Sequence, residues 1–398
     1  MQPEFTGSSG QETVQWRGLA AAIASISVVG IAIGLGMPLL SFVLEGRGFS
    51  AGMIGLNTAV AGLASLAAAP FATPLAVRFG MIPVVLVMLG VGGVSFAGFH
   101  FTDSFAGWFV LRATLHFAIT VLFILSESWI NHCAPPARRG FVLGIYATVL
   151  SLGFAAGPWI FAQLGSDGFL PFGFTLVLIA LAAVPVLFAK RDAPDLSEGD
   201  ALSGGTGFWR YIVLVPTATF AVFVFGAVET GGFALFPVYG LRVGYDEASA
   251  ALLLTMVGLG NVVLQIPLGI ISDRVRDRRT ILLACAATGL AGMALLPFIA
   301  HDWHLTAALL FVWGGVVAGL YTVGLAHLGS RLTGRQLVQA NAAFVFCYGL
   351  GMLAGPAAIG VGMEISGPDG FAHVLAIFFA AYIALILSRT VIRPRKAT

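Results

Sequence analysis

Long apolar runs separated by short polar breaks dominate the pattern of this chain. A helix needs about 20 mostly apolar residues to cross the hydrocarbon core of a bilayer. Turn residues and charges divide the first half into six runs, at approximately 17–44, 51–77, 81–101, 105–131, 139–165 and 169–189. The second half divides into six more, at approximately 209–240, 247–272, 279–300, 306–329, 337–362 and 370–391. The pattern predicts an all-α integral membrane protein with twelve transmembrane helices.

One long polar stretch, residues 190–208, separates the two groups of six runs. It is acidic and contains Ser and Gly, which indicates a flexible linker. We therefore expect an N-terminal six-helix bundle at 17–189 and a C-terminal six-helix bundle at 209–391, with tails at 1–16 and 392–398. The N-terminal tail lacks the basic start and short apolar core of a cleaved signal, so the first run is expected to remain as a spanning helix.

The two halves look duplicated. A GxxxGP motif in the fifth run recurs in the eleventh run 198 residues later, and Arg78 and Arg274 stand 196 residues apart after the second and eighth runs. Equal spacing of two marks predicts two pseudo-symmetric, parallel repeats. Small residues let helices approach closely and proline loosens the local hydrogen-bond ladder, so the motif is expected to serve packing or as a hinge. Its residues are Gly153, Gly157, Pro158, Gly351, Gly355 and Pro356.

The seventh run is long, and we expect it to tilt or break at Gly231, Gly232 and Pro237.

Composition supports the membrane interpretation. The chain is 58% hydrophobic and only 10% charged, against about 25% charged for an average soluble domain. A water-soluble fold could not hide that much apolar surface. The three cysteines are isolated and are expected to be packing residues, not a metal or redox site. We also expect no cofactor and no nucleic-acid partner.

The basic residues predict an orientation. Seventeen of the 20 lysines and arginines fall on the side of the two termini, whereas Arg47 and Arg242 fall on the opposite side and Arg112 lies within a span. Lysine and arginine accumulate in cytoplasmic loops. Both termini are therefore expected in the cytoplasm, in a protein of the bacterial cytoplasmic (inner) membrane.

Charged residues inside the apolar runs are the first candidates for a functional site. A charge at the centre of a membrane helix costs at least ~2.5 to 3.5 kcal/mol, so it normally faces a cavity or a partner. Arg112 and His116 are four residues apart in the fourth run and share a helix face. Glu229 lies about 20 Å into the seventh run at a rise of 1.5 Å per residue, near the middle of a core about 30 Å thick.

Several motifs resemble the major facilitator superfamily, and the resemblance covers essentially the whole chain. The loop from Gly269 to Arg279 looks like its cytoplasmic signature of glycine, aspartate, arginine and a basic pair, whereas the first-half copy around Arg78 lacks the glycine and the aspartate. Arg112 matches the arginine of the fourth-helix signature, with His116 at the position of the usual glycine. Finer detail is similar to the YcaD-like branch, through Ser126-Glu127-Ser128, Phe236-Pro237-Val238-Tyr239 and Gln265-Ile-Pro267-Leu-Gly269.

The resemblance implies two six-helix bundles that work by alternating access, as a functional monomer, with a cavity lined by the first, fourth, seventh and tenth helices. The face of Arg112 and His116 would then look toward Glu229, and a buried carboxylate that both protons and substrate can neutralise would couple them. The alternatives are a structural hydrogen-bonding role for Arg112, a permanent ion pair of Arg112 with Glu229, and simple packing of His116. The remaining candidates for the substrate and proton site are Trp313, Tyr321, Asn261 and Gln265, and for these polar residues an interhelical hydrogen bond is the alternative.

A second group of charges should lie at the cytoplasmic boundary. Glu127 is about 22 Å beyond Arg112 along the helix, which favours a gate residue over a substrate ligand. Ion pairs that hold one access state and break in the other would supply the bistable element of alternating access. The expected partners of Glu127 are Arg78, Arg138 and Arg139, and the expected second cluster is Asp273, Arg274, Arg278 and Arg279.

These features favour a secondary active transporter of a small organic solute, driven by protons. Antiport, hence efflux, is favoured over uptake by symport, because a fifth-helix motif similar to GxxxGP is associated with proton-driven antiporters of the superfamily. A metal importer should show methionine pairs at helical spacing, and the nine methionines show no MxxxM pair. No Walker, HExxH or GxSxG motif indicates an ATPase or an intramembrane enzyme. A membrane sensor without transport could share the fold.

Overall fold

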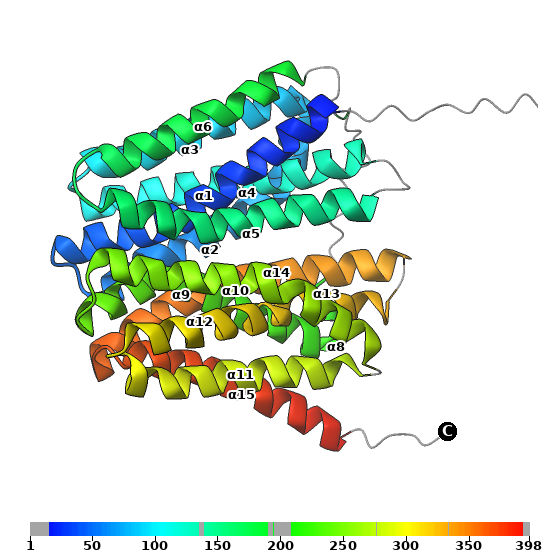
Figure 1. The fold of residues 1–398 in the computed structure, drawn as a ribbon. Coiled ribbons are helices and arrows are strands. Elements are labelled where there is room, and N and C mark those ends of the chain that lie inside the picture. Colours follow the sequence, from blue (N-terminus) through cyan, green and yellow to red (C-terminus); the bar gives the residue numbers. More distant parts are fainter. Residues whose placement is uncertain are drawn as a thin grey trace, which may run out of the picture.

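The computed structural model describes residues 16–134, 139–189, 194, 208–275, 277–332 and 334–392. Every regular element in these ranges is a helix, and two stacked bundles result (Figure 1). The upper bundle contains α1 (Trp16–Gly46), α2 (Ala51–Phe79), α3 (Met81–Phe101), α4 (Phe105–Cys133), α5 (Arg139–Leu164) and α6 (Leu170–Phe188). The lower bundle contains α8 (Trp209–Leu214), α9 (Pro216–Arg242), α10 (Glu247–Arg274), α11 (Arg278–Ile299), α12 (Trp303–Val317), α13 (Gly319–Gly329), α14 (Gly334–Ser366) and α15 (Gly370–Ile392).

Twelve stretches of the described helices are long and apolar enough to cross a membrane, which confirms the prediction of twelve spans. The tenth span is divided into α12 and α13 at Ala318, directly before Gly319. The predicted tails and most of the predicted linker lie outside the described residues.

The seventh run does contain a break, but the predicted position of that break is wrong. The helix is interrupted at Val215, directly before Pro216. A proline has no backbone N–H to donate, and it disfavours the helical conformation of the residue before it. Gly231, Gly232 and Pro237 lie inside the continuous helix α9. Most residues of α9 are buried, so tertiary packing keeps this segment helical in spite of its glycines and proline.

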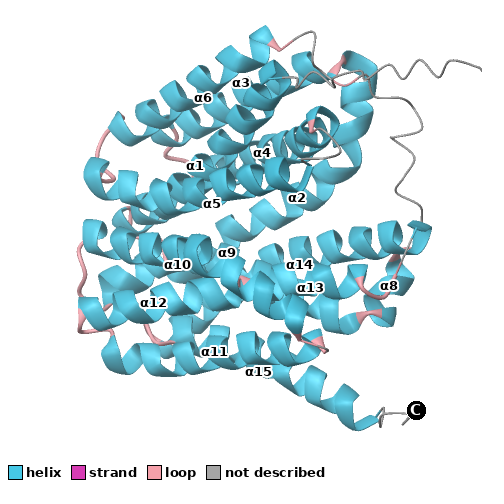
Figure 2. Ribbon diagram, turned by 45° about the vertical axis from the view of Figure 1, so that its right-hand side comes forward, coloured by secondary structure: helices cyan, strands magenta, loops and turns pink. Residues whose placement is uncertain are grey.

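The start of α1 and the end of α15 lie at the same end of the molecule (Figure 1). We call this end the terminal face and the opposite end the distal face. The helices run between the two faces, so the loops alternate between them (Figure 2).

The GxxxGP motifs explain the packing inside each half. In the N-terminal half α5 lies against α1 so closely that a Cβ atom on Gly153 would come within 2.8 Å of the Cα atom of Gly30. In the C-terminal half α14 lies against α9 in the same way, and a Cβ atom on Gly351 would come within 2.8 Å of the nitrogen of Ala227. The two halves therefore repeat one helix contact, and only residues without a side chain fit it.

Two further glycine contacts join the halves. Helix α2 packs on α14, and a Cβ atom on Gly62 would lie 2.8 Å from the carbonyl oxygen of Gly349. Helix α5 packs on α10, and a Cβ atom on Gly258 would lie 2.7 Å from the Cα atom of Ala155. Because Gly62 and Gly258 are 196 residues apart, the two seams are related by the internal repeat.

Polar contacts lock the two halves together at the distal face. Arg242 at the end of α9 forms an ion pair with Glu45 of α1, with 3.0 Å between Nε and Oε1. Glu364 near the end of α14 accepts hydrogen bonds from the Ser50 hydroxyl and, at 3.1 Å, from the Gly52 amide at the start of α2. The hydroxyl of Ser166, between α5 and α6, donates to Glu247 of α10 at 2.8 Å.

Within the described part of the chain, the hydrogen bonds and ion pairs seen between the halves all lie at this distal face. The halves are therefore held closed on the side away from the termini.

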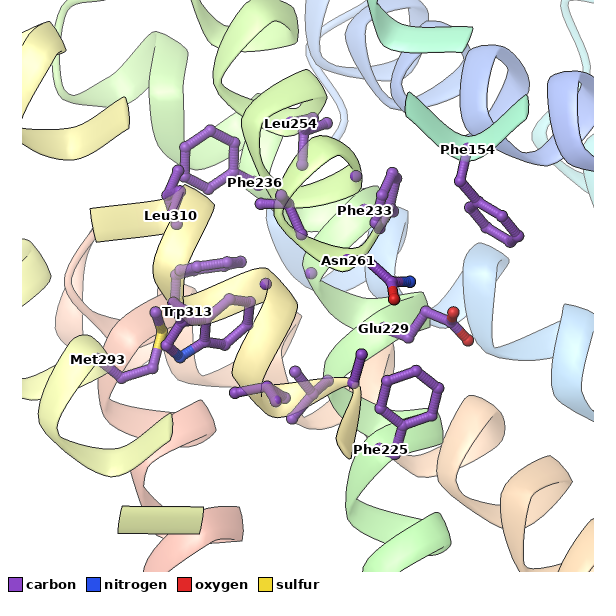
Figure 3. Close-up of a pocket in the computed structure, with 18 residues that line it drawn as sticks. Phe154, Phe225, Glu229, Phe233, Phe236, Leu254, Asn261, Met293, Leu310 and Trp313 are labelled. Carbon is purple, nitrogen blue, oxygen red and sulfur yellow. The ribbon is translucent and has the colours of Figure 1, made fainter. Parts of the chain in front are cut away.

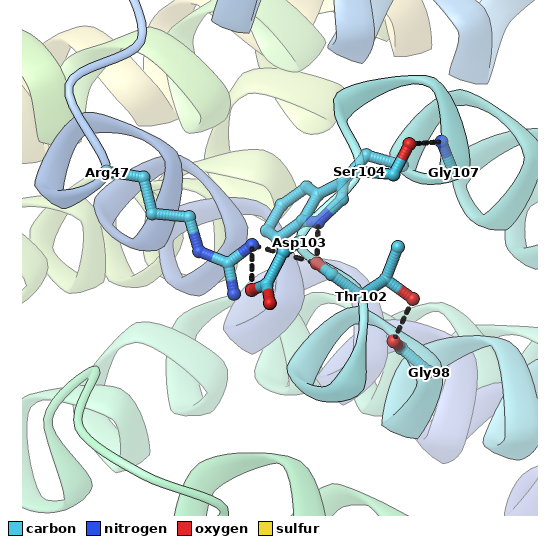
Figure 4. Close-up of polar contacts among 7 residues, drawn as sticks. Arg47, Gly98, Thr102, Asp103, Ser104 and Gly107 are labelled. Carbon is cyan, nitrogen blue, oxygen red and sulfur yellow. Dashed lines mark hydrogen bonds and ion pairs between the residues drawn. The ribbon is translucent and has the colours of Figure 1, made fainter.

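The distal loops of the N-terminal half are also tied to one another (Figure 4). The Arg47 guanidinium donates to the carbonyl of Thr102 at 2.8 Å, lies 3.6 Å from the Asp103 carboxylate and stacks over the ring of Trp108. The Trp108 indole donates to the same carbonyl, also at 2.8 Å. These contacts fix the loop after α1 against the loop before α4, so this half presents a braced distal end.

Candidate functional site

A pocket opens among the helices of the C-terminal half, with about 630 Å³ of atom-free space that includes some open solvent. Most of its wall comes from α9, α10 and α12, and single residues come from α5, α11 and α15. The lining is apolar and aromatic apart from one carboxylate and one amide (Figure 3). Its residues are Phe154, Phe225, Val228, Glu229, Gly232, Phe233, Phe236, Leu254, Val257, Gly258, Asn261, Met293, Leu310, Trp313, Gly314, Val317, Ala318 and Phe371.

Glu229 is the carboxylate of this pocket. It is half-buried on α9, and the hydroxyl of Tyr348 on α14 donates to its Oε2 atom at 2.5 Å. A hydrogen bond from a neutral hydroxyl satisfies the carboxylate only in part, since each carboxylate oxygen can accept more than one bond. Oε1 has no hydrogen-bond donor among the described residues.

Asn261 on α10 supplies the pocket amide. Its side-chain oxygen is buried and finds no hydrogen-bond partner among the described residues. A buried acceptor without a partner is costly, and such atoms in native proteins usually mark a bound water or ligand. Asn261 and Glu229 both line the pocket, and in the view of Figure 3 both side chains point toward the side on which Phe154 lies.

The aromatic wall is held by packing against neighbouring helices. The Trp313 indole donates to the Gly289 carbonyl of α11 at 3.2 Å, so its N–H is satisfied and its ring is what remains for a ligand. Phe233 of α9 meets Phe154 of α5 edge to face, with 5.7 Å between ring centroids. Phe154 is the lining residue contributed by the N-terminal half, so the pocket wall includes both halves.

Tyr321 and Gln265 do not belong to the pocket lining. Tyr321 packs against two neighbours of Glu229, with its ring centroid 5.7 Å from that of Phe225 and 6.1 Å from that of Tyr348. Gln265 is half-buried on α10, one turn beyond Asn261.

Arg112 and His116 lie inside the N-terminal half. Arg112 is 1% exposed and donates through Nε to the Asn57 oxygen on α2 at 3.1 Å, while Nη1 lies 3.9 Å from the sulfur of Met37 on α1. His116 is 4% exposed, and its Nδ1 lies 3.1 Å from the backbone oxygen of Arg112.

The expected orientation of this face toward Glu229 is therefore wrong for this structure. The Arg112 guanidinium is hydrogen-bonded to Asn57 of α2, whereas Glu229 is hydrogen-bonded to Tyr348 of its own half. The contacts match the alternative in which Arg112 forms structural hydrogen bonds, although Nη2 and the Asn57 amide nitrogen remain buried without a partner among the described residues.

The predicted gate residues are only partly brought together. Asp273 and Arg278 form an ion pair at 3.0 Å, and Arg278 also donates to the Ala326 carbonyl of α13 at 3.2 Å, so this link stays within the C-terminal half. Arg274 ends α10, and the backbone nitrogen of Arg279 is capped by Asp277.

Glu127 is exposed on α4, and in the described contacts the Arg78 guanidinium stacks on Phe79 instead of pairing with it. Arg138 and the side chain of Arg139 lie outside the described residues.

Comparison with known proteins decides the family. The model of the Major Facilitator Superfamily matches residues 22–255 and 218–398. This chain belongs to the major facilitator superfamily. It is accordingly a multi-pass membrane transporter, and the finer resemblance to the YcaD-like branch remains a prediction.

Relatives in this superfamily cover nearly the whole chain. An uncharacterized MFS-type transporter of Bacillus subtilis, YfkF, is 27% identical over 370 residues, which is 92% of this chain and 93% of the relative. An uncharacterized MFS-type transporter of Yersinia pestis is 22% identical over 297 residues, which is 73% of this chain and 75% of the relative.

Solved structures confirm the fold. The nucleoside transporter NupG superposes with a TM-score of 0.74 at 13% identity, covering 96% of this chain and 100% of NupG. A bacterial homologue of the human lysosomal transporter Spinster, in an inward-facing and unoccupied conformation, gives a TM-score of 0.69 at 14% identity, with 96% of each chain covered.

The described residues contain no group of three or more His, Cys, Asp or Glu side chains that could hold a metal ion. Tyr348 is the functional neighbour that sequence reasoning left among the ordinary polar residues of the apolar runs. A signal was present, because Tyr348 lies one turn before Gly351, at the start of a motif that holds α14 against α9 and therefore against Glu229.

Proposed function

We propose that this transporter is a proton-coupled antiporter that exports a small organic solute by alternating access. The observation that carries the proposal is Glu229, the one ionisable side chain among the described residues of the pocket wall. A proton and a solute would compete for its single charge, which is the thermodynamic requirement for exchange. Arg112 and His116, with their bonds inside the N-terminal half, are assigned a structural part.

Tyr348 connects Glu229 to the seam between the halves. Its hydroxyl bonds the carboxylate, and the next residue, Gly349, lies directly against Leu66 of α2. Loading or unloading of Glu229 changes what Tyr348 can bond, and α14 carries that change to its contact with α2. Such a differential interaction in two states is what allows a ligand to shift a conformational equilibrium.

The orientation of the transporter follows from the proposed cytoplasmic position of the termini in a bacterial cytoplasmic membrane. The bonded distal face would then be periplasmic, and this structure would be an inward-facing state of a monomer. The ion pair of Glu45 with Arg242 and the bonds of Glu364 would open in the other state. Asp273 and Arg278 would brace the cytoplasmic end of the C-terminal half, with Glu127 available as a gate residue.

Uptake by proton symport is the second candidate. It uses the same site, and it differs in that the solute must bind together with the proton instead of displacing it. NupG, a nucleoside transporter by name, shows that the fold also serves nucleosides. The sign of the proton movement distinguishes the two candidates.

The test is flux in liposomes that contain a pH-sensitive dye. A gradient of each compound from a panel of cationic, zwitterionic, neutral and anionic solutes is imposed, and wild type is compared with Glu229→Gln. Antiport predicts proton movement opposite to the solute, lost in Glu229→Gln and kept in the control Asp103→Asn, whose exposed carboxylate lies in the loop before α4 and outside the pocket. Proton-coupled flux that is unchanged in Glu229→Gln would overturn the proposal.

A further inference from the structure

We infer that the pocket binds a protonated primary or secondary amine attached to an aromatic or apolar body. The inference deepens the proposed function, on which it rests for the claim that the bound compound is transported. It stands on three observations about the pocket: its charge, its unpaired hydrogen-bond acceptors and its aromatic faces.

In the part of the chain that the structure describes, the pocket wall carries one negative charge and no positive one. Among its lining residues Glu229 is a carboxylate, and Lys, Arg and His are absent. The cation that the sequence proposed for this site, Arg112, donates to Asn57 and Met37 inside the other half. An anionic solute would meet Glu229 without compensation, and a neutral solute would leave the carboxylate without a counter-charge in an apolar surrounding.

Two acceptors in the pocket lack a donor. Tyr348 occupies Oε2 of Glu229, and the described residues leave Oε1 open. The buried Asn261 oxygen also has no partner among them. An ammonium group with two or three N–H bonds has enough donors for both Glu229 and Asn261, whereas a quaternary ammonium group has none. The acceptors therefore select the degree of substitution at nitrogen as well as the charge.

The rest of the wall fits an aromatic body. Phe225, Phe233 and Trp313 offer ring faces or edges to the pocket, and the Trp313 N–H is already used by Gly289. Aromatic rings favour stacked or edge-on ring partners, and their faces also attract cations. Phe154 closes the wall from the N-terminal half by its contact with Phe233.

Exchange at Glu229 is expected to be electroneutral. Exchange of one proton for one monovalent ammonium ion at a single carboxylate moves no net charge across the membrane. Transport should therefore follow the pH gradient and should be insensitive to an imposed membrane potential, which otherwise acts on every charge that is moved.

Binding to the purified protein tests the assignment. Three bodies, phenyl, naphthyl and indolyl, each carry four head groups on an ethylene or equivalent spacer: ammonium, trimethylammonium, hydroxyl and carboxylate. Isothermal titration measures each affinity. We expect the ammonium form of at least one body to bind about tenfold or more tightly than its hydroxyl form, because a hydrogen bond to a charged group is about twice as strong as a neutral one. The trimethylammonium form should be weaker by several-fold, and the carboxylate form should not bind.

Three variants separate the two acceptors. Glu229→Gln should abolish the preference for ammonium over hydroxyl. Asn261→Leu should reduce the preference for ammonium over trimethylammonium, because the ammonium group then keeps only its bond to Glu229, and it should leave trimethylammonium binding unchanged. Gln265→Leu, one turn along α10 and outside the pocket lining, is the matched control and should change neither.

The assignment is overturned if, for all three bodies, the hydroxyl or carboxylate form binds as tightly as the ammonium form. It is also overturned if Asn261→Leu leaves the preference for ammonium over trimethylammonium unchanged. Its failure is distinguishable from failure of the proposed function. Proton-coupled flux of a neutral or anionic solute through Glu229 would refute the amine site and preserve antiport. Ammonium binding without any proton-coupled flux would preserve the amine site and refute antiport.

Discussion

Each half of this transporter carries a charged side chain inside a spanning helix, Arg112 in α4 and Glu229 in α9, and the two halves accommodate it differently. Arg112 is 1% exposed, surrounded by α1 and α2, and bonded to Asn57. Glu229 is half-buried, faces a pocket and is bonded by a single hydroxyl from α14.

The internal repeat shows that the two charges do not occupy equivalent positions. A shift of 198 residues relates Arg112 to Leu310 and Glu229 to Ile31, so each charge interrupts the repeat in one half only. The glycine contacts of the same helices are shared by both halves. Packing therefore follows the duplicated scaffold, and chemistry is added where the halves diverge. A fully packed charge contributes to structure, whereas a charge at a pocket wall is available to protons and ligands.

The largest effect on stability is expected from Arg112→Ala. Truncation leaves a cavity and an orphaned Asn57 oxygen, which together should lower the free energy of unfolding by about 3 kcal/mol. Glu229→Ala, at a solvated pocket, should change it by less than about 1 kcal/mol. Thermal unfolding of both variants in the same detergent checks the contrast. Equal losses would show that the two charges are accommodated alike.

The glycine contacts should behave alike in the two halves, because the repeat preserves them. Gly157→Ala and Gly355→Ala each push a methyl group against the backbone of a facing helix, α1 or α9. Each should destabilise by about 1 to 3 kcal/mol, the usual cost of overpacking. Gly90→Ala, where the added carbon meets nothing within 4 Å, is the control. A loss confined to one half would contradict a shared scaffold.

Tyr348→Phe should separate transport from folding in the C-terminal half. The variant keeps the ring contacts with Phe225 and Tyr321 and removes the hydroxyl that bonds Glu229. A hydrogen bond to a charged group contributes about 1.5 to 3 kcal/mol, so transport should fall by about tenfold or more, while the variant stays folded and its free energy of unfolding falls by no more than that amount. Tyr321→Phe should have little effect on transport. Equal transport by both variants would remove Tyr348 from the account.

The smallest expected effect on stability concerns two helix N-caps, one in each half, that differ in whether the capping side chain can ionise. Asp246 caps α10, and the Ser249 backbone N–H that it accepts lowers the pKa of this carboxyl below its usual value. A lowered pKa contributes stability above the ordinary value near pH 4, and that contribution is lost as pH falls through the folded value. Asp246→Ala should therefore cost less than about 1 kcal/mol at neutral pH, and the cost should shrink in acid.

Ser104 caps α4 in the N-terminal half through its hydroxyl, which does not titrate in this range. Ser104→Ala should therefore cost a similar small amount that is independent of pH. Thermal melts across acidic pH compare the two variants, and a pH-independent cost for Asp246→Ala would exclude its carboxylate as the origin.

The fold followed from the sequence because a bilayer imposes strong rules. Long apolar runs, the basic loops and the duplicated GxxxGP motif were enough to predict twelve spans in two related bundles. The break at Val215 was missed because three candidate breakers, Gly231, Gly232 and Pro237, stood deeper in the same run. Their helix is buried on most sides, and propensity does not report such packing.

The site was predictable only in part. Depth along a helix located Glu229, and the expected cavity-lining tenth helix suggested Trp313; both line the pocket. Asn261, a candidate only as a polar residue inside an apolar run, lines it as well. Helix periodicity placed Arg112 and His116 on one face, but it gave no information on how that helix is rotated in its bundle. The rotation depends on tertiary contacts such as that with Asn57. Sequence reasoning also could not choose Tyr348 among several similar polar residues.

The most direct test of the central claim is to count the protons that Glu229 exchanges with a ligand. Isothermal titration of the tightest head-group compound, in buffers of different ionisation enthalpy from about pH 5 to about pH 9, gives the number of protons released on binding. Antiport through Glu229 predicts a release that approaches about one proton at its maximum, is absent in Glu229→Gln and persists in Arg112→Met. Release that persists in Glu229→Gln, or proton uptake in the wild type, would contradict the account.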